Sequence, residues 1–364
     1  MVLLIVAIVA GLSIKFSSDY QYGLARAEAR WHGTQARAYL LSGEEAAIKF
    51  LTIYPPEMES NYIGEVWSNP VPLELPDNMG NLNLKMEDAN SQFNLNSLAS
   101  GVLGAPPGPG GGQGGGTPLN PGPLGQLPLP GKGLNQVGNV VANVSKGGSD
   151  PASYTPSQRM FIRLLQVLPN PEDQNRPLLH GLEEATGIME AIIDWTDPDQ
   201  NQTGVYGAED DYYLSQPDPY QAANMPFRSI EELQMVRGVT PAIMKAVRPY
   251  ITVLDPAERL NVNTMNEIFY RCVNDKSTLN PLDESQAKSL QQSVPTVGHF
   301  TNQADFDNAL NRVLGANADK EMTVKTSLFW LNTAVQIGDQ RRIGRSLMQR
   351  GTPFFKVLRR EDGA

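Results

Sequence analysis

The sequence predicts an α+β protein, in which one long N-terminal helix is followed by some strand, a mainly helical middle and a strand meander at the C-terminus. Three observations predict this class. Residues 1–54 contain no proline, apolar residues recur at helical spacing in the middle of the chain, and sustained alternation appears near its end. Spacing of three to four residues is typical of helices, and alternation is typical of strands. With 364 residues the chain can form two domains or more.

The first element expected along the chain is a single helix that spans residues 1–54. Its first fourteen residues, MVLLIVAIVAGLSI, are apolar, and we interpret 1–14 as the part that lies in a membrane or in a filament. After this run apolar residues recur at helical spacing, and Pro55-Pro56 end the pattern. At a rise of 1.5 Å per residue, a helix of about fifty residues is roughly 80 Å long.

The start of the sequence differs from a secretory signal. Such a signal carries Lys or Arg ahead of its apolar core and a cleavage site after it, and neither pattern is present around 1–14. An apolar run with an amphipathic continuation is typical of a mature pilin-type subunit. We therefore expect that a leader has already been removed ahead of Met1, with an ordinary signal anchor as the alternative.

Two zones of different composition follow the long helix. Residues 55–100 are mixed and rich in Asn, and the alternation in LNLKMED indicates a strand. Residues 101–150 are dominated by Gly, Pro, Asn and Leu, with almost no charge and no periodicity. Such a segment cannot bury a core, so we expect a disordered loop there.

Residues 151–320 are expected to form a helical domain. Thr240 is a candidate N-cap, and Pro241 suits the first turn of the helix that follows it. The lone cysteine, Cys272, lies in an apolar stretch and is expected to be buried. Helices are predicted at 159–168, 178–195, 229–236, 240–251, 264–273 and 300–314.

The C-terminal residues 321–364 predict a three-stranded antiparallel meander. Leu331 to Ile337 alternate with polar or small residues, Gly338-Asp339 supplies a two-residue turn, and Arg341 to Leu347 alternate again. A second turn at Gly351-Thr352 leads into the last strand, PFFKVLRR.

Two Asn-rich segments resemble each other, Phe93 to Leu98 and Leu260 to Met265. In both, alternating apolar residues end at a Ser or Thr. Because Asn side chains can bond their own backbone, we interpret both segments as strand-to-helix turns.

Acidic side chains are most concentrated in DWTDPDQNQTGVYGAEDD, residues 194–211. No Lys or Arg occurs between Met189 and Phe227, so the acidic groups of this loop need an external cation if they lie close together. All-oxygen ligands in a flexible loop suit Ca²⁺. The block is not an EF-hand, because Gln202 stands where the sharp turn needs Gly. A solvated acidic loop is the alternative. The candidate ligands are Asp197, Asp199, Asn201, Glu209, Asp210 and Asp211.

No arrangement typical of an enzyme is found. His32, His180 and His299 are far apart, and there is no Gly-x-Ser-x-Gly elbow, P-loop or Cys–His pair. A periplasmic hydrolase that uses Glu209 and Asp211 stays a minor alternative.

Residues 233–247 have the pattern of a helix-hairpin-helix, and residues 182–192, with Gly187-Ile188 at the bend, show it more faintly. DNA-binding hairpins carry a second Gly where this chain has Thr240, and the net charge is −10. We therefore interpret the hairpin as a packing unit and expect no nucleic-acid partner. The alternative is a type IV pilus or competence tip protein that binds DNA with Arg237, Lys245 and Arg248.

Taken together, five segments resemble the minor pseudopilins of the K type (GspK) of type II secretion systems. They are the N-terminal apolar helix, EDANSQFNLNSL (87–98), the DWTDPDQ and GAEDDYYL block (194–214), SIEELQMVRGV (229–239) and the terminal meander. They follow the family's order and span most of the chain, and the 194–214 block is the most specific. The Gly/Pro-rich zone 101–150 is longer than expected for the family.

The resemblance implies a pilin-like fold in which the long helix packs on a small antiparallel sheet, with a large, mainly helical domain inserted between strands. Residues 55–100 and 321–364 would then form the pilin-like α/β domain and 151–320 the insertion. It also implies leader cleavage and N-methylation at Met1 by prepilin peptidase. The chain would cross the bacterial inner membrane once, in contact with lipid before assembly, with its globular part in the periplasm. Calcium is implied in the helical domain.

The implied function is that of a non-enzymatic subunit at the tip of the pseudopilus, which starts assembly with I- and J-type pseudopilins on the inner-membrane secretion platform. Ile5 stands where most pilins have a Glu that pairs with the amine of a neighbouring subunit. A subunit without this carboxylate suits the tip. Trp31, Ala38 and Leu41 are expected to pack against partner helices.

Overall fold

The computed structural model describes residues 2–99, 150–173, 176–351 and 355–363, and within these ranges the chain forms two compact units. One unit combines residues 1–89 with 325–364, and the other consists of residues 90–324. The helical unit is therefore inserted between strands of the first. Its observed limits differ from the expected 151–320, because Phe93, Leu95 and Leu98 pack in its core.

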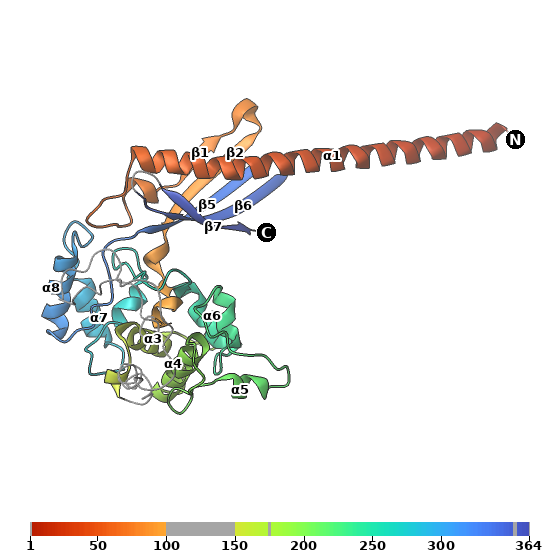
Figure 1. Ribbon diagram of the computed structural model, residues 1–364. Helices are drawn as coiled ribbons and strands as arrows, with labels where there is room; N and C mark the ends of the chain where they lie inside the picture. Colours follow the sequence, from red (N-terminus) through yellow and green to blue (C-terminus); the bar gives the residue numbers. More distant parts are fainter. Residues whose placement is uncertain (1, 100–149, 174–175, 352–354, 364) are drawn as a thin grey trace, which may run out of the picture. The chain divides into compact units, whose positions relative to one another are not determined.

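The first unit consists of one long helix and a five-stranded antiparallel sheet (Figure 1). The helix is α1 (Val2–Ile53), and it ends just before Pro55. The expected α+β, pilin-like class is confirmed. The strands are β1 (Val71–Glu74), β2 (Gly80–Asp88), β5 (Leu328–Ile337), β6 (Gln340–Gln349) and β7 (Lys356–Gly363), in the order β1-β2-β5-β6-β7. The short 3₁₀ turns η1 (Val66–Ser68) and η2 (Pro76–Asn78) flank β1.

The C-terminal half of α1 packs on the sheet through one stripe of small and apolar residues. Ala47 and Leu51, one turn apart, are fully buried. Gly43 permits the close approach, since a Cβ there would lie 3.0 Å from Thr333 and 3.1 Å from Leu84. The buried Glu44 carboxylate accepts hydrogen bonds from Arg360 and Ser346, which attaches α1 to β7 and β6.

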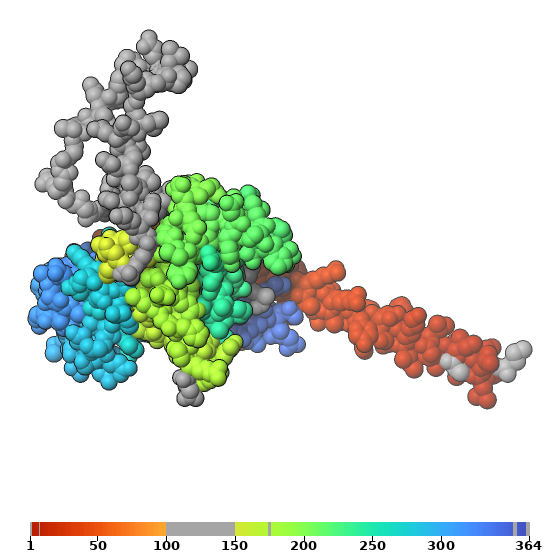
Figure 2. All heavy atoms as spheres, turned by 90° about the horizontal axis from the view of Figure 1, so that it is seen from below, coloured from red at the N-terminus to blue at the C-terminus, as the bar shows by residue number. Residues whose placement is uncertain are grey.

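The N-terminal half of α1 has no such neighbours. Val2 is 75% exposed and Phe16 is 76% exposed, and in Figure 2 this part of the helix stands clear of other side chains. Its most apolar stretch of 18 residues has a mean hydropathy of 1.9, enough by length and composition to cross a membrane.

The second unit is mainly helical. Its α-helices are α3 (Pro156–Val167), α4 (Leu182–Thr196), α5 (Asp210–Leu214), α6 (Pro241–Val247), α7 (Glu284–Gln291) and α8 (Gln303–Leu314). Its 3₁₀ segments are η3 (Ala89–Ser91, which begins at the unit boundary), η4 (Leu95–Ala99), η5 (Pro151–Ser153), η6 (Ile230–Met235), η7 (Arg248–Tyr250) and η8 (Glu267–Arg271). Two short strands, β3 (Phe93–Asn94) and β4 (Ile251–Thr252), pair in parallel.

Several expected elements differ from the structure. The segments 229–236 and 264–273 are 3₁₀ turns rather than α-helices, and the helix expected at 240–251 stops at Val247, with Pro249 just beyond. The faint hairpin at 182–192 is wrong, because α4 runs unbroken through Gly187. Helix α7 was not expected. The Gly338-Asp339 turn joins β5 to β6 as predicted, whereas Thr352 and most of the zone 101–150 lie outside the described residues.

The two Asn-rich segments form matching turns. The side-chain oxygen of Asn94 accepts the backbone N–H of Asn96, and that of Asn261 accepts the N–H of Asn263. This confirms their interpretation as backbone-bonded turns.

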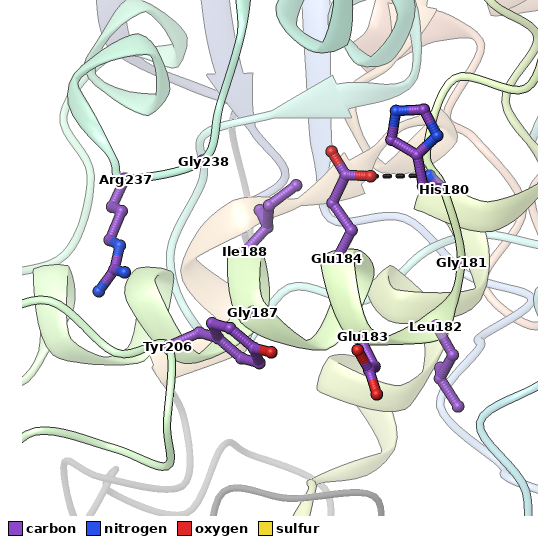
Figure 3. Close-up of a pocket in the computed structure, with 10 residues that line it drawn as sticks. All are labelled: His180, Gly181, Leu182, Glu183, Glu184, Gly187, Ile188, Tyr206, Arg237 and Gly238. Carbon is purple, nitrogen blue, oxygen red and sulfur yellow. Dashed lines mark hydrogen bonds between the residues drawn. The ribbon is translucent and has the colours of Figure 1, made fainter.

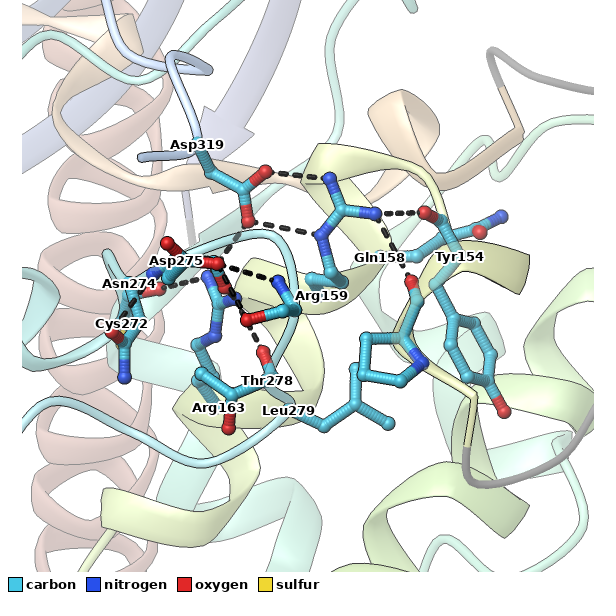
Figure 4. Close-up of polar contacts among 12 residues, drawn as sticks. Tyr154, Gln158, Arg159, Arg163, Cys272, Asn274, Asp275, Thr278, Leu279 and Asp319 are labelled. Atoms are coloured by element: carbon cyan, nitrogen blue, oxygen red, sulfur yellow. Dashed lines mark hydrogen bonds and ion pairs between the residues drawn. The ribbon is translucent and has the colours of Figure 1, made fainter. Parts of the chain in front are cut away.

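A buried ion network holds the helical unit together (Figure 4). Asp319 accepts hydrogen bonds from Arg159 and Arg163, two residues of α3 one turn apart. Arg163 is fully buried, and its two terminal nitrogens also donate to the carbonyl groups of Cys272, Asp275 and Thr278. One guanidinium thereby joins α3 to two distant segments. Cys272 is itself fully buried, as expected.

Candidate functional site

The acidic block lies in the helical unit, in the loop between α4 and α5. Asp197 is the C-cap of α4, its N–H bonds the Ile193 carbonyl, and Pro198 follows. Glu209 is the N-cap residue of α5, although its side chain makes no capping bond. The loop thus begins and ends at carboxylates held by helix termini.

Two buried carboxylates of α4 hold this loop in place. Asp194 accepts the N–H of Thr203 at 2.9 Å, and Glu190 accepts the N–H of Tyr206 at 2.8 Å. Gly204, with φ +61°, would place a Cβ inside van der Waals contact of the Glu190 carboxylate. A Cβ added at Gly207 would likewise collide with the Asp194 carboxylate and with the Thr203 carbonyl. The glycines are needed because the backbone lies directly on the carboxylates.

Asp197, Asp199 and Glu209 form the carboxylate cluster. One oxygen from each lies within 4.8 Å of the others. Asp197 is 5% exposed and Glu209 is 7% exposed. In the described part of the chain, Oδ1 of Asp197 and both carboxylate oxygens of Glu209 are buried without a hydrogen-bond partner. Buried oxygens of this kind are costly unless something binds them.

The raised pKa values of two carboxyl groups in the cluster also favour a bound cation. Burial, together with the charges of Asp194, Asp197, Asp199 and Asp210, raises the pKa of Glu209 to about 8. Burial, Asp199 and Asp194 raise the pKa of Asp197 to about 7. Without a cation, the carboxyl groups of Asp197 and Glu209 therefore tend to hold their protons near neutral pH. A divalent cation with oxygen ligands would let them ionise together, and the residues present suit Ca²⁺.

Three of the six predicted ligands meet in the carboxylate cluster, Asn201 lies beside it in contact with Asp199, and Asp210 and Asp211 do not join it. The Asp210 carboxylate accepts the N–H of Ala222 and the side chain of Gln221. Asp211 is exposed, and the Asn201 side chain donates to Asp199. The fold turns Asp210 and Asp211 away because they occupy the first turn of α5.

Known proteins are similar to this chain both in its middle part and over its whole length. A family model described as type II secretion system (T2SS), protein K matches residues 91–257. Type II secretion system protein K of Pseudomonas aeruginosa is 27% identical, with 100% of this chain and 91% of that protein covered. The protein of the same name from Pectobacterium carotovorum is 26% identical, with 100% and 94% covered.

The middle of the chain therefore matches the protein K family model, and relatives that carry the same name are similar to it over its whole length.

Among solved structures, the fold of this chain is similar to a chain of the GspK–GspI–GspJ complex from enterotoxigenic Escherichia coli. The TM-score is 0.61 at 19% identity, with 93% of this chain and 99% of that chain covered. The family model includes the carboxylate cluster and the hairpin, and the relatives extend over α1.

The hairpin of residues 233–247 has few free cationic side chains with which to bind DNA. Gly238, with φ +84°, forms the bend between η6 and α6. Arg237 donates to the Gly207 carbonyl and stacks on Tyr212, and Arg248 pairs with Glu231. Of the three cations that a DNA site would use, two are therefore already engaged, which argues against that alternative.

On α1, the three residues predicted to meet partner helices are exposed. Trp31 is 65% exposed and Leu41 is 50% exposed, and Ala38 lies between them. At 100° per residue this surface lies on the side of the helix away from Gly43 and Ala47, which face the sheet. Ile5 is also exposed. Met1 lies outside the described residues.

The sequence reasoning missed the two carboxylates that shape the loop. Glu190 and Asp194 are 2% and 0% exposed. Their signal was present in the sequence, since two acidic residues four apart interrupt the apolar run from Ile188 to Trp195.

Proposed function

We propose that this chain is a non-enzymatic minor pseudopilin at the tip of the type II secretion pseudopilus, where it starts assembly with I- and J-type subunits. The observation that carries the proposal is the combination of a long α1, whose N-terminal half is exposed, with a large helical unit inserted into the sheet unit. The similar solved chain comes from a complex that contains GspI and GspJ. The proposed location is the inner membrane, which α1 crosses once, with the globular part of the chain in the periplasm.

The proposed mechanism of assembly depends on the exposed part of α1. Its N-terminal half makes no contact with the sheet, so it is available first to lipid and then to the helices of a filament. Ile5 offers no carboxylate to the amine of another subunit. The inserted unit adds bulk to the sheet unit, which suits a subunit on which no further one is stacked.

The test is complex formation with the I- and J-type pseudopilins of the same source. The described residues before about 25 are exposed and lie outside the core of the sheet unit, so a fragment from there onward retains the packing of α1 on the sheet. Light scattering should show one species with one copy of each. Three separate species at micromolar concentration would contradict the proposal.

A matched pair of variants distinguishes helix packing from a general loss of fold. Trp31→Ala with Leu41→Ala should weaken the complex, because these side chains supply apolar area on the free face of α1. Ile63→Ala removes a side chain that is 72% exposed outside α1, and should leave the complex intact.

We also propose that the helical unit binds calcium through Asp197, Asp199 and Glu209. The supporting observation is the set of buried, unpartnered oxygens on Asp197 and Glu209. The ion would neutralise the cluster and join the end of α4 to the start of α5. Its role is structural, and it needs no catalytic step. Calcium should raise the melting temperature of this unit, and equal melting with calcium and with chelator would contradict the site.

A further inference from the structure

A cavity of about 470 Å³ opens beside the N-terminus of α4 in the helical unit. Gly187 and Ile188 of α4 line its interior, Tyr206 of the loop flanks it, and Arg237 and Gly238 of the hairpin stand at the other end (Figure 3). Cavities of this size are typical of ligand sites. The carboxylate cluster does not line it, and neither calcium nor tip assembly requires it.

Contacts within the helical unit fix the side chains that form the walls of this cavity. Gly187 lets the Tyr206 side chain lie on the helix, since a Cβ there would lie 3.0 Å from Cβ of Tyr206. The Tyr206 N–H bonds the buried Glu190. Arg237 donates to the Gly207 carbonyl at 3.2 Å, with its guanidinium 4.7 Å from the centre of the Tyr212 ring. The cavity is therefore preformed, which lowers the entropic cost of binding.

The interior of the cavity suits a bulky apolar group. Ile188 is buried beneath it, Leu182 is half-buried at its edge, and Tyr206 is 42% exposed. An aromatic or branched side chain placed here would cover the Tyr206 ring and remove apolar surface from water.

The opposite end of the cavity carries negative charge. Glu183 is exposed, and among the described residues its carboxylate makes no hydrogen bond or ion pair. Glu184 lies beside it and accepts the His180 N–H through one oxygen only. Arg237 is the only Lys or Arg among the residues that line the cavity, and it is engaged elsewhere. This end therefore attracts a cation.

We propose that the cavity binds an extended polypeptide segment of another protein, which inserts one bulky apolar side chain against Ile188 and Tyr206 and places a neighbouring Lys or Arg at Glu183 and Glu184. A polypeptide supplies both groups on adjacent residues. The carboxylates repel the phosphates of a nucleic acid, which excludes that class here.

The test uses the full chain in lipid nanodiscs and a fluorescein-labelled peptide, Gly-Lys-Phe-Lys-Gly-Gly, followed by fluorescence anisotropy. Binding should saturate and should weaken between about 50 and about 300 mM salt, because the ion pairs are exposed. Replacing Phe by Ala, or both Lys by Glu, should abolish it. Equal binding of the Glu peptide, equal binding to empty nanodiscs or no saturation would overturn the proposal.

Two variants with matched controls assign the signal to the cavity. Glu183→Gln should weaken binding by about two- to fivefold, the range of one exposed ion pair, whereas Glu172→Gln, an exposed Glu that does not line the cavity, should not weaken it. Tyr206→Ala should weaken binding by about tenfold or more, and Val205→Ala should have no effect. Both cavity side chains are substantially exposed, so their removal leaves the core intact. Unchanged binding in both cavity variants would overturn the proposal.

Discussion

Replacing Glu209 by Gln should have effects of opposite sign with and without calcium. Gln keeps the shape of the side chain and removes the charge. Burial and four neighbouring carboxylates raise the pKa of Glu209 to about 8, and both of its oxygens are buried without partners. In chelator at pH 9 the wild-type chain must carry this unpaired anion, so Glu209→Gln should melt at a higher temperature.

The sign of the pH dependence follows from the raised pKa. A carboxyl whose pKa is higher in the folded state stabilises the fold while it is protonated, and this contribution is lost as the pH rises through the folded-state pKa. In chelator, the melting temperature of the wild-type helical unit should therefore fall between pH 5 and pH 9. The advantage of Glu209→Gln should vanish at pH 6, where Glu209 is protonated.

With calcium the order should reverse. At a hundredfold excess over its dissociation constant, a ligand that binds only the folded state stabilises it by about 2.7 kcal/mol. For a unit of this size, that corresponds to a rise of about 5–10 °C in melting temperature. Glu209→Gln should lose most of this rise, because it removes the carboxylate with two free oxygens.

Differential scanning calorimetry of the fragment in calcium and in chelator, at pH 6 and pH 9, measures both effects. Glu172→Gln, on the surface of the same unit, is the control and should behave as wild type. If Glu209→Gln keeps the full calcium-dependent rise, or if the wild-type melt in chelator does not change with pH, the reasoning is refuted.

Three further predictions concern the same unit. The calcium-dependent rise should shrink below about pH 7, since at that pH only roughly one Glu209 in ten is ionised without the metal; a pH-independent rise would contradict this. Gly207→Ala should lower the melting temperature in chelator and in calcium, because its Cβ would collide with Asp194; an unchanged melt would show that the loop can shift freely. Asp319→Asn should destabilise the unit by about 3–5 kcal/mol, because it leaves the buried Arg163 without its counter-charge. Glu231→Gln, in an exposed pair, should cost about 1 kcal/mol or less, and equal losses in the two variants would refute the difference.

The local sequence pattern was sufficient to predict an element where a single residue type determines the backbone conformation. The helix α1 could be predicted to its last turn, because apolar spacing continues to Phe50 and Pro55 prevents continuation. The turn at Gly338-Asp339 and the three C-terminal strands followed from alternation. By contrast, η6 and η8 have helical spacing but only five or six residues, too few for the pattern to distinguish 3₁₀ from α.

The candidate site could be predicted only in outline. The lack of Lys or Arg in the acidic block indicated a cation, but not which carboxylates would meet. Asp210 follows Glu209 directly, yet its carboxylate caps the Ala222 N–H instead of joining the cluster. That choice depends on where residue 222 lies, which no local pattern contains.

By itself, the sequence determined the long apolar helix, the inserted helical region, the C-terminal meander and the family that these resemble, since each depends on periodicity, proline or composition. Only the tertiary structure decided that Asp197, Asp199 and Glu209 meet, that Glu190 and Asp194 hold their loop, and that α4 and the hairpin enclose a cavity. The physical reason is that burial and mutual distance set the pKa and the partners of a carboxylate, and both arise only when distant segments pack together.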